Sequence, residues 1–501
     1  MGLFLTGSKQ PPQTTVQAIQ IMKRISQYAL LISLTTGIAY IAIYILKSYQ
    51  FVNAGNRVYV EHGLQALFLM GVILLGWQEM GYPRITKSLF SVRNSVLLSL
   101  SLLLILCINQ SIGQFATGLF VTCAFVYFLR NGKLYEINRV YYFLFLYVLL
   151  RFLGTIGTND GFRFPEKLFT FILLPLAFSF VRIEKRTSFR VLYLFFRAML
   201  IYMSCTLVYW WYNIQYFGLN IGNWLISKET LHDGFPPYHW TSGWALYEHP
   251  SYISLVLVAG LISGFYLYFK KQPDSIISQL ELIVYAAFIT LTVLVMESRI
   301  GVVMVALTIA ITLLYYLRLK SRHFKQIAVV VLVVGMGGLF YMGDSVSGFM
   351  DDNVRRTDNT LALNYIKAHP WWGVGFHQQA LALKQQEQIM LNVLPALPFP
   401  KTYTHNQLLG DMVQFGVAGA LVLVLLIVGL VGYSIQSRSY LLQLLMCVCI
   451  VFMCIEEPLY GQAGITRFMV FLSFFVHISE SGKPIKSYTI LRRNLKSDTI
   501  A

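Results

Sequence analysis

The chain has 501 residues, of which 56% are hydrophobic and only 12% are charged, and its mean hydropathy is +0.60. A soluble domain cannot reach these values without exposing apolar surface, so the composition excludes an ordinary soluble protein and predicts an all-α, polytopic membrane protein. The formal net charge of +17 is then a signal for orientation in the membrane, not for binding of nucleic acid.

Apolar runs near 20 residues in length predict about 14 transmembrane helices, within a range of about 12 to 14. Their approximate centres fall at residues 37, 71, 101, 120, 148, 174, 203, 260, 289, 309, 335, 418, 448 and 471. Lys9, Lys23 and Arg24 precede the first run, and no small-residue cleavage site follows it directly. We therefore expect an uncleaved first helix.

The loops between these runs predict how the chain lies in the membrane. With the N-terminus in the cytoplasm, most of the 39 Lys and Arg residues fall on that side, as the positive-inside rule requires. We expect transmembrane helices in 1–218, an outer loop at 219–250, central transmembrane helices at 251–343, a large periplasmic loop at 344–405, C-terminal transmembrane helices at 406–480 and a basic cytoplasmic tail at 481–501.

The large loop carries signals for ordered structure on the membrane surface. Residues 357–367 can form a short amphipathic helix with Leu361, Tyr365 and Ile366 on one face, and Pro370 would stop it. Residues 380–394 are a second helical candidate. Such helices favour a lid or a substrate platform, although a merely solvated loop remains the alternative.

Charged residues at the outer ends of the apolar runs are candidates for function, because a charge at membrane depth is costly unless it has a partner or faces water. Glu297 and Arg299 lie between two such runs. A guanidinium can hold a phosphate through two parallel N–H bonds, although Arg299 could instead anchor a helix end. For Arg151, Arg467 and the Glu456-Glu457 pair, structural salt bridges or interfacial snorkelling are favoured.

His405 precedes the apolar run from Gln407 to Val431, so it is predicted to lie where a helix N-terminus meets water and lipid headgroups. A histidine there can exchange a proton near neutral pH, and the helix end offers N–H groups to an anion. The alternative is a histidine that only caps the helix. Gly416 and Gly419 are three residues apart, which predicts one helical face that a neighbouring helix approaches closely.

Three motifs carry a resemblance to a known family. His405-Asn406, followed after nine residues by Gly416 and after two more by Gly419, resembles the pattern of bacterial O-antigen ligases. Ser298-Arg299-Ile300-Gly301 and the segment 364–376 resemble signatures of the wider O-antigen ligase and polymerase superfamily. The resemblance covers about residues 240–430. It implies a GT-C-type glycosyltransferase that uses an undecaprenyl-pyrophosphate glycan at the periplasmic face of the bacterial inner membrane, without metal or cofactor.

One motif of the family is incomplete. Family ligases usually carry a further arginine shortly before a Gly and an Asn-Pro or His-Pro pair, whereas residues 239–250 contain no arginine. His239, His249 or Arg163 would supply the second cation, or the pyrophosphate is held differently. The predicted catalytic residues are His405 and Arg299, and the predicted substrate-binding residues are Asn406, Glu297, His239, Glu248, His249, Arg355, Arg356 and Arg163.

The predicted reaction begins when neutral His405 orients or deprotonates an acceptor hydroxyl, which attacks the anomeric carbon of the donor while Arg299 stabilises the departing pyrophosphate. Other GT-C enzymes use an acidic pair in the first outer loop, but residues 48–62 offer only Glu61, which favours metal independence. The acceptor would be lipid A core for a ligase, a growing glycan for a polymerase or a protein for an O-oligosaccharyltransferase. A transporter of lipid-linked sugar is less favoured, because the polar groups gather at the ends of the spans.

Overall fold

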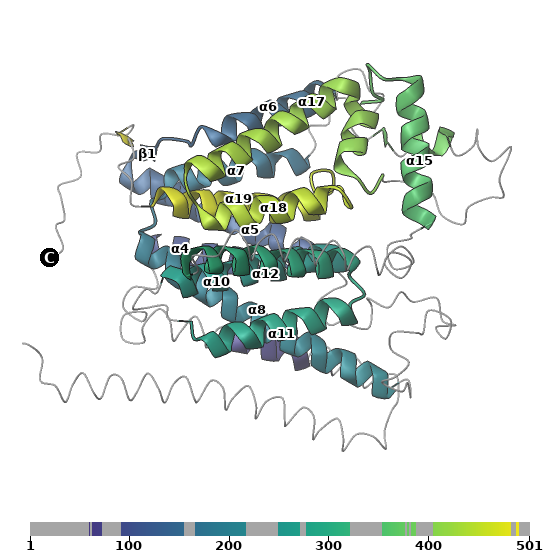
Figure 1. The fold of residues 1–501 in the computed structure, drawn as a ribbon. Helices are drawn as coiled ribbons and strands as arrows, with labels where there is room; N and C mark the ends of the chain where they lie inside the picture. Colours follow the sequence, from purple (N-terminus) through teal and green to yellow (C-terminus); the bar gives the residue numbers. More distant parts are fainter. Residues whose placement is uncertain are drawn as a thin grey trace, which may run out of the picture.

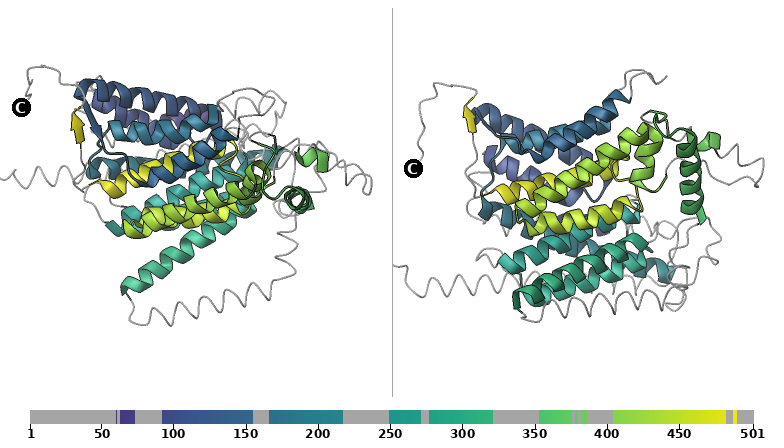
Figure 2. Two further views of the ribbon diagram at one scale, coloured as in Figure 1. Left: turned by 90° about the horizontal axis from the view of Figure 1, so that it is seen from above. Right: turned by 45° about the horizontal axis from the view of Figure 1, so that its top comes forward.

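The computed structural model describes residues 60, 63–72, 92–154, 166–216, 249–270, 277–320, 353–375, 378–379, 382–386, 404–481 and 487–489. These residues are mostly helical (Figures 1 and 2). The labelled helices are α4 (Val92–Leu106), α5 (Gln110–Asn131), α6 (Val140–Leu153), α7 (Glu166–Phe180), α8 (Lys185–Tyr216), α10 (Pro250–Lys270), α11 (Gln279–Val295), α12 (Arg299–Lys320), α15 (Asn353–Ala368), α17 (Gln407–Gln436), α18 (Tyr440–Met453) and α19 (Gln462–Glu480), and residues 63–72 form a further helix.

Side chains at the helix ends explain where several helices begin and stop. The Asn109 side chain accepts a hydrogen bond from the backbone N–H of Ile112 and so caps the start of α5. Gly132, in the left-handed conformation, ends that helix. Ser278 and Glu281 form a reciprocal capping box at the start of α11. Local sequence thus sets the boundaries, while the apolar faces set the packing.

The helices lie side by side along a roughly common direction, and short links such as 107–109, 296–298 and 437–439 make consecutive helices antiparallel (Figure 1). One end of this bundle, here the site end, carries the starts of α10, α12, α17 and α19, and α15 crosses it. The other end, here the basic end, carries a two-stranded antiparallel ribbon of β1 (Lys133–Tyr135) and β2 (Ser487–Thr489).

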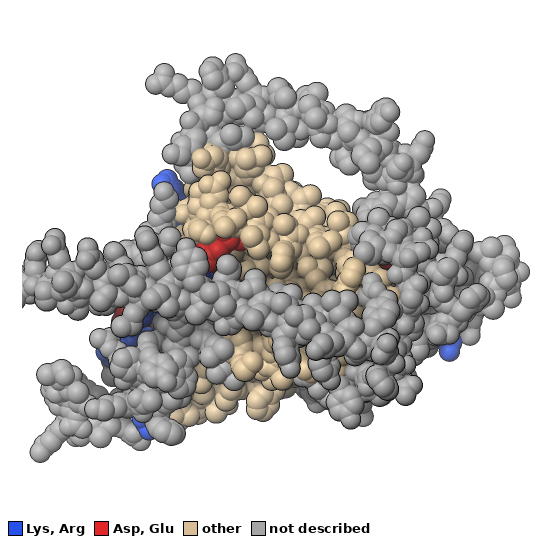
Figure 3. Space-filling model, turned by 90° about the horizontal axis from the view of Figure 1, so that it is seen from below, with Lys and Arg blue, Asp and Glu red and all other residues tan. Residues whose placement is uncertain are grey.

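Six of the described helices are long and apolar enough to cross a membrane, and six shorter apolar helices accompany them. Together they lie over twelve of the predicted centres, and the remaining two, at 37 and 335, fall outside the described residues. The described surface in Figure 3 is a broad uncharged area with charged side chains toward its borders. These features are those of a multi-pass helical membrane protein.

The interior of the bundle is built around α8, α10 and α19, whose membrane-length segments are largely buried, whereas those of α5, α12 and α17 are mostly at the surface. Arg467 of α19 is fully buried and donates from Nε to the Cys107 carbonyl at 2.9 Å and from Nη2 to the Ile108 carbonyl at 2.6 Å. These carbonyls follow the end of α4, so the guanidinium caps that helix. Arg467 is therefore structural, and it does not snorkel toward the interface.

The predicted helix in the large loop is confirmed. Residues 357–367 lie within α15, and Leu361, Tyr365 and Ile366 are buried in a second apolar cluster with Ala382, Leu383 and Val413. This cluster joins α15 to the start of α17. Residues 382–386 of the second candidate are helical, and most of its remainder lies outside the described residues.

Candidate active site

The segment before α17 is anchored on both sides of His405. Asn406 caps the helix, because its Oδ1 accepts from Leu409 N at 3.1 Å, and its Nδ2 donates to the Cys454 carbonyl at 3.1 Å. The Thr404 hydroxyl and backbone N–H both donate to Glu457. His405 between them has a φ of +52°, a left-handed conformation that is uncommon for residues other than glycine. Its neighbours therefore fix the direction in which the imidazole points.

Two carboxylates flank the imidazole of His405. Nδ1 lies 3.7 Å from Glu456 Oε2, and Nε2 lies 3.6 Å from Asp358 Oδ2. Glu456 comes from the link between α18 and α19, and Asp358 comes from α15. The histidine side chain is 25% exposed, whereas both acids are buried. The ring is thus held between two protein elements and still reaches solvent.

Glu456, in the link between α18 and α19, contacts α15, α10 and the segment before α17. Its Oε1 accepts from Arg355 Nη2 of α15 at 2.9 Å and from Ser251 Oγ of α10 at 3.1 Å. Burial acts to raise the pKa of this carboxyl, but the polar contact with His405 and the charges of His249, Arg355 and His405 outweigh it, so the pKa lies below its usual value. Glu456 is therefore a carboxylate at neutral pH.

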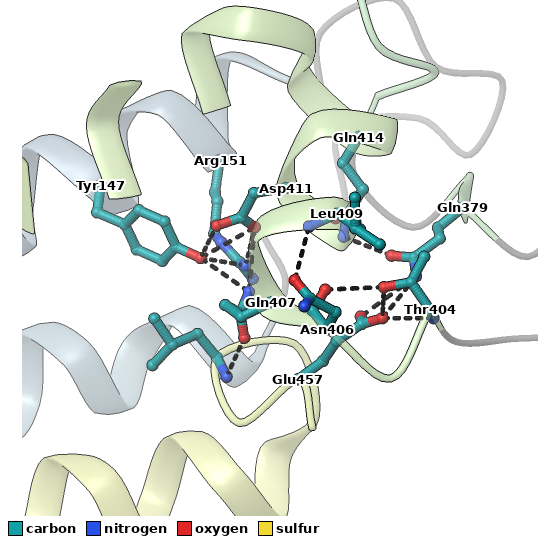
Figure 4. A network of polar contacts seen from close by, with 11 residues as sticks. Tyr147, Arg151, Gln379, Thr404, Asn406, Gln407, Leu409, Asp411, Gln414 and Glu457 are labelled. Atoms are coloured by element: carbon teal, nitrogen blue, oxygen red, sulfur yellow. Dashed lines mark hydrogen bonds and ion pairs between the residues drawn. The ribbon is translucent and has the colours of Figure 1, made fainter. Parts of the chain in front are cut away.

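The neighbouring Glu457 has a different role. Its carboxyl accepts from Gln379 Nε2 at 2.9 Å and from both donors of Thr404, as Figure 4 shows. Burial raises its pKa to about 7, although the hydrogen bonds from Thr404 and Gln379 act in the opposite direction. Glu457 fixes the backbone immediately before His405.

The break in α17 corrects the prediction for Gly416 and Gly419. Gly416 has φ +63° and ψ −150°, so the helix is interrupted there, and Gly419 packs against the Asp411 carbonyl of the preceding segment. Among the described residues, the atoms nearest to Gly416 belong to Trp371 and Trp372, and those nearest to Gly419 belong to α17 itself. A Cβ on Gly416 would lie 2.3 Å from the Trp371 carbonyl, since the loop 370–375 occupies that space. Both the positive φ of residue 416 and the close approach of the loop require a glycine at this position.

The loop 370–375 is bound to the broken helix through its backbone. Val374 N donates to Val413 O at 3.0 Å, Gly375 N to Gln414 O at 2.8 Å, and Val417 N to Pro370 O at 3.1 Å. These bonds satisfy peptide groups that the break in α17 leaves without helical partners. The glycine at the break thus leaves room for the loop 370–375 on α17.

The segment 298–301 places Arg299 at the first position of α12. The Oγ atoms of Ser298 and Ser254 are hydrogen-bonded at 2.8 Å, and a Cβ on Gly301 would lie 2.4 Å from Ser254 Oγ. Serine and glycine therefore allow α12 to pack closely on the first turns of α10. Arg299 is half-buried, and the adjacent Glu297 is exposed with a φ of +52°.

The first turns of α10 link the two predicted catalytic residues. Ser254 contacts Ser298, which precedes Arg299, and Ser251, one turn earlier, contacts Glu456 beside His405. The exposed His249 lies immediately before α10. The site end thus carries His405, Arg299, Glu297, Asn406, His249 and Arg355. Arg163, His239, Glu248 and the side chain of Arg356 lie outside the described residues.

Sequence reasoning missed two members of this site. Glu456 was predicted to be structural, and it does pair with Arg355, but the same carboxylate also faces His405. Asp358 carried no signal in the sequence, because it is one polar residue among several in an amphipathic helix. An indication for Glu456 was available, since an acidic pair followed by Pro458 interrupts an apolar region.

Residues 284–424 match a family model described as O-antigen ligase. This region belongs to the O-antigen ligase superfamily. It contains Arg299, the loop 370–375, His405 and the break at Gly416, so the matched region includes the predicted catalytic pair and the loop bound to α17. A comparison with curated proteins gives no match. The match supports a glycan-transfer function of the ligase or polymerase type and implies lipid-linked glycan substrates in general.

Proposed function

We propose that this protein is an O-antigen ligase-like glycosyltransferase, which moves a glycan from an undecaprenyl-pyrophosphate carrier to a hydroxyl of lipid A core. The observation that carries the proposal is the placement of His405, which lies within the O-antigen ligase domain between two carboxylates and at the start of a helix. A partly exposed imidazole in a fixed orientation suits a group that meets an acceptor hydroxyl.

In the proposed reaction, the acceptor oxygen forms a bond to the anomeric carbon, and the bond from that carbon to the pyrophosphate oxygen breaks. The hydroxyl proton passes to His405, and the electron pair of the broken bond leaves with undecaprenyl pyrophosphate. Nδ1 of His405 is buried against Glu456, so Nε2 is the nitrogen that meets the acceptor. Glu456 and Asp358 orient the ring, since a carboxylate beside each nitrogen restricts its rotation.

The leaving group would lie near the start of α12. Arg299 occupies the first helical position there, and α10 and α17 also begin at the site end. Helix N-termini present unpaired N–H groups and a partial positive charge, which together favour a phosphate. Arg355 and His249 are the described candidates for the second cation, because the charge of each acts on Glu456 at the same end of the bundle.

The proposed orientation puts the site end in the periplasm and the basic end in the cytoplasm of a bacterial inner membrane. The support is the distribution of charge, because many described basic residues gather at the basic end. They include Arg130, Lys133, Arg139, Arg182, Lys185 and Arg186.

A polymerase or a protein O-oligosaccharyltransferase of the same superfamily is the second candidate. The observation that favours it is the lack of an arginine in residues 239–250, where family ligases have one. The surface glycan of a deletion strain separates the candidates. Loss of all attached glycan, with the lipid-linked polymer retained, indicates a ligase, whereas a single attached repeat unit indicates a polymerase.

Purified protein provides the direct test of the proposed function. With lipid-linked donor and lipid A core, we expect glycan transfer that persists in excess EDTA. A loss of transfer that magnesium or manganese restores would contradict metal independence. An absence of transfer to any hydroxyl acceptor, with the donor bound, would contradict the proposed function itself.

A further inference from the structure

A cavity of about 340 Å³ lies at the basic end, opposite the candidate active site. Its walls come from the last turns of α7, α17 and α19, from the segment 135–139 and from the link between α7 and α8. The volume falls within the range of about 300 to 1,000 Å³ that ligand pockets usually have. Nothing in the proposed glycan transfer uses this cavity.

The wall of the cavity presents a negative charge. Tyr433 Oη donates to Glu480 Oε1 at 2.5 Å and accepts from Asn138 Nδ2 at 2.7 Å, so this chain of hydrogen bonds holds the carboxylate in place. Three helices end around the cavity, and their C-termini carry partial negative charge. A cation that donates hydrogen bonds is the group that this wall would stabilise.

Positive charge lines the same cavity. Arg139 and Arg182 belong to its lining, and both are exposed to solvent. A guanidinium binds phosphate with paired, charge-assisted hydrogen bonds. The cavity therefore offers sites for both charges of one zwitterionic group.

The surface beside the cavity is apolar. Tyr142 and Phe143 of α6 are exposed next to the lining residue Tyr141, and Ile435 of α17 is exposed next to Gln436. The helices α6 and α17 pack against each other, and their outward faces continue along the bundle as apolar surface. Acyl chains could lie along these faces, which favours a lipid over a soluble ester.

We propose that this cavity binds the headgroup of a zwitterionic phospholipid that carries a primary amine, such as phosphatidylethanolamine. The phosphodiester lies against Arg139 and Arg182, and the ammonium donates to Glu480. A headgroup with only negative charge would meet the Glu480 carboxylate unfavourably. A trimethylammonium group has no N–H to donate, so phosphatidylcholine satisfies this wall less well.

The test uses the full-length, delipidated protein in detergent and measures lipid binding by native mass spectrometry. We expect phosphatidylethanolamine to bind about tenfold more tightly than phosphatidylcholine or phosphatidylglycerol, since only its ammonium donates a charge-assisted hydrogen bond to Glu480. Glu480→Gln should abolish this preference. Glu184→Gln, which neutralises an exposed glutamate paired with Arg93 at the same end, should leave the preference unchanged.

Two further measurements test whether the ligand is a lipid and where its phosphate binds. Glycerophosphoethanolamine, which has the same headgroup without acyl chains, should compete only weakly. Replacing Arg139 and Arg182 together by glutamine should weaken the binding of all three lipids. Equal binding of the three lipids by the unmodified protein, or an unchanged preference in Glu480→Gln, would overturn the proposal. Competition by glycerophosphoethanolamine as strong as that by the lipid would overturn the lipid assignment.

Discussion

Two arginine–carboxylate pairs at the site end have the same N–O distance and opposite surroundings. Arg151 and Asp411 are 2.9 Å apart with both side chains 0% exposed, whereas Arg355 and Glu456 are 2.9 Å apart with exposures of 26% and 7%. Figure 4 shows Tyr147 and Gln407 closing around the first pair. His405 lies beside the second pair.

The difference lies in what each pair can still contact. Asp411 accepts from Arg151, from Tyr147 and from Gln407, and Gln407 in turn accepts from Leu459 N. This network joins α6 to the start of α17, and the Asp411 side chain within it is fully buried. Glu456 shares its oxygens among Arg355, Ser251 and a partly exposed histidine. Similar geometry therefore serves stability in one place and, as we propose, catalysis in the other.

The largest effect on stability is expected at the fully buried pair of Arg151 and Asp411. Arg151→Met leaves the Asp411 charge buried without its cation, and breaking a buried pair in this way costs about 3–5 kcal/mol. Thermal unfolding in detergent and the yield of folded protein measure the loss. The double variant Arg151→Met with Asp411→Leu should recover much of it, because no charge then remains buried. A single variant with unchanged melting would contradict a structural role.

The partly exposed pair of Arg355 and Glu456 should show the reverse pattern, with a larger loss of activity than of stability. Glu456→Gln keeps the size of the side chain and removes the charge that faces His405 and Arg355. The hydrogen bond from Arg355 then loses the charge of its acceptor. A charged hydrogen bond is worth about 1.5–3 kcal/mol, so turnover falls roughly 10- to 100-fold if this bond is needed in the transition state. We expect this loss in transfer assays, with a smaller change in melting than for Arg151→Met. Glu184→Gln, in the exposed pair with Arg93, is the matched control and should leave both measurements unchanged.

A smaller effect, confined to a pH range, is expected at Glu457. Its carboxyl has a pKa of about 7 in the folded protein and 4.5 in the absence of these surroundings. Between these values the folded state keeps a proton that the unfolded state has lost, so stability falls as pH rises from about 4.5 to about 7 and then levels off. Melting curves across this range should show a weaker fall for Glu457→Gln. Identical pH profiles for the two proteins would contradict the burial argument.

The sequence predicted the parts of the fold that depend on local pattern. Apolar runs located the described helices, and the spacing of Leu361, Tyr365 and Ile366 predicted both α15 and its buried face. The break at Gly416 was not predictable from spacing, because two glycines three residues apart also fit an unbroken helix. Only the position of Trp371 in space shows why a side chain cannot be accommodated at the break.

The candidate site was predicted only in part, because the sequence shows local pattern but not the contacts between distant segments. His405 and Arg299 stand out in the sequence because each is a polar residue at the end of an apolar run. Asp358 and Glu456 belong to the site because α15 and the link between α18 and α19 meet there, although these segments are far apart along the chain. Contacts between distant segments leave no spacing pattern in one sequence.

The most direct test of the account is a comparison of donor affinity and transfer rate for His405→Ala and Arg299→Lys, with expression and melting recorded for both. If His405 acts on the acceptor, His405→Ala lowers turnover by about 10² to 10⁴ and leaves donor affinity almost unchanged. If Arg299 binds pyrophosphate through its planar guanidinium, Arg299→Lys keeps the charge but loses most of the activity while the protein still folds. Near-normal transfer by either correctly folded variant would remove that residue from the mechanism.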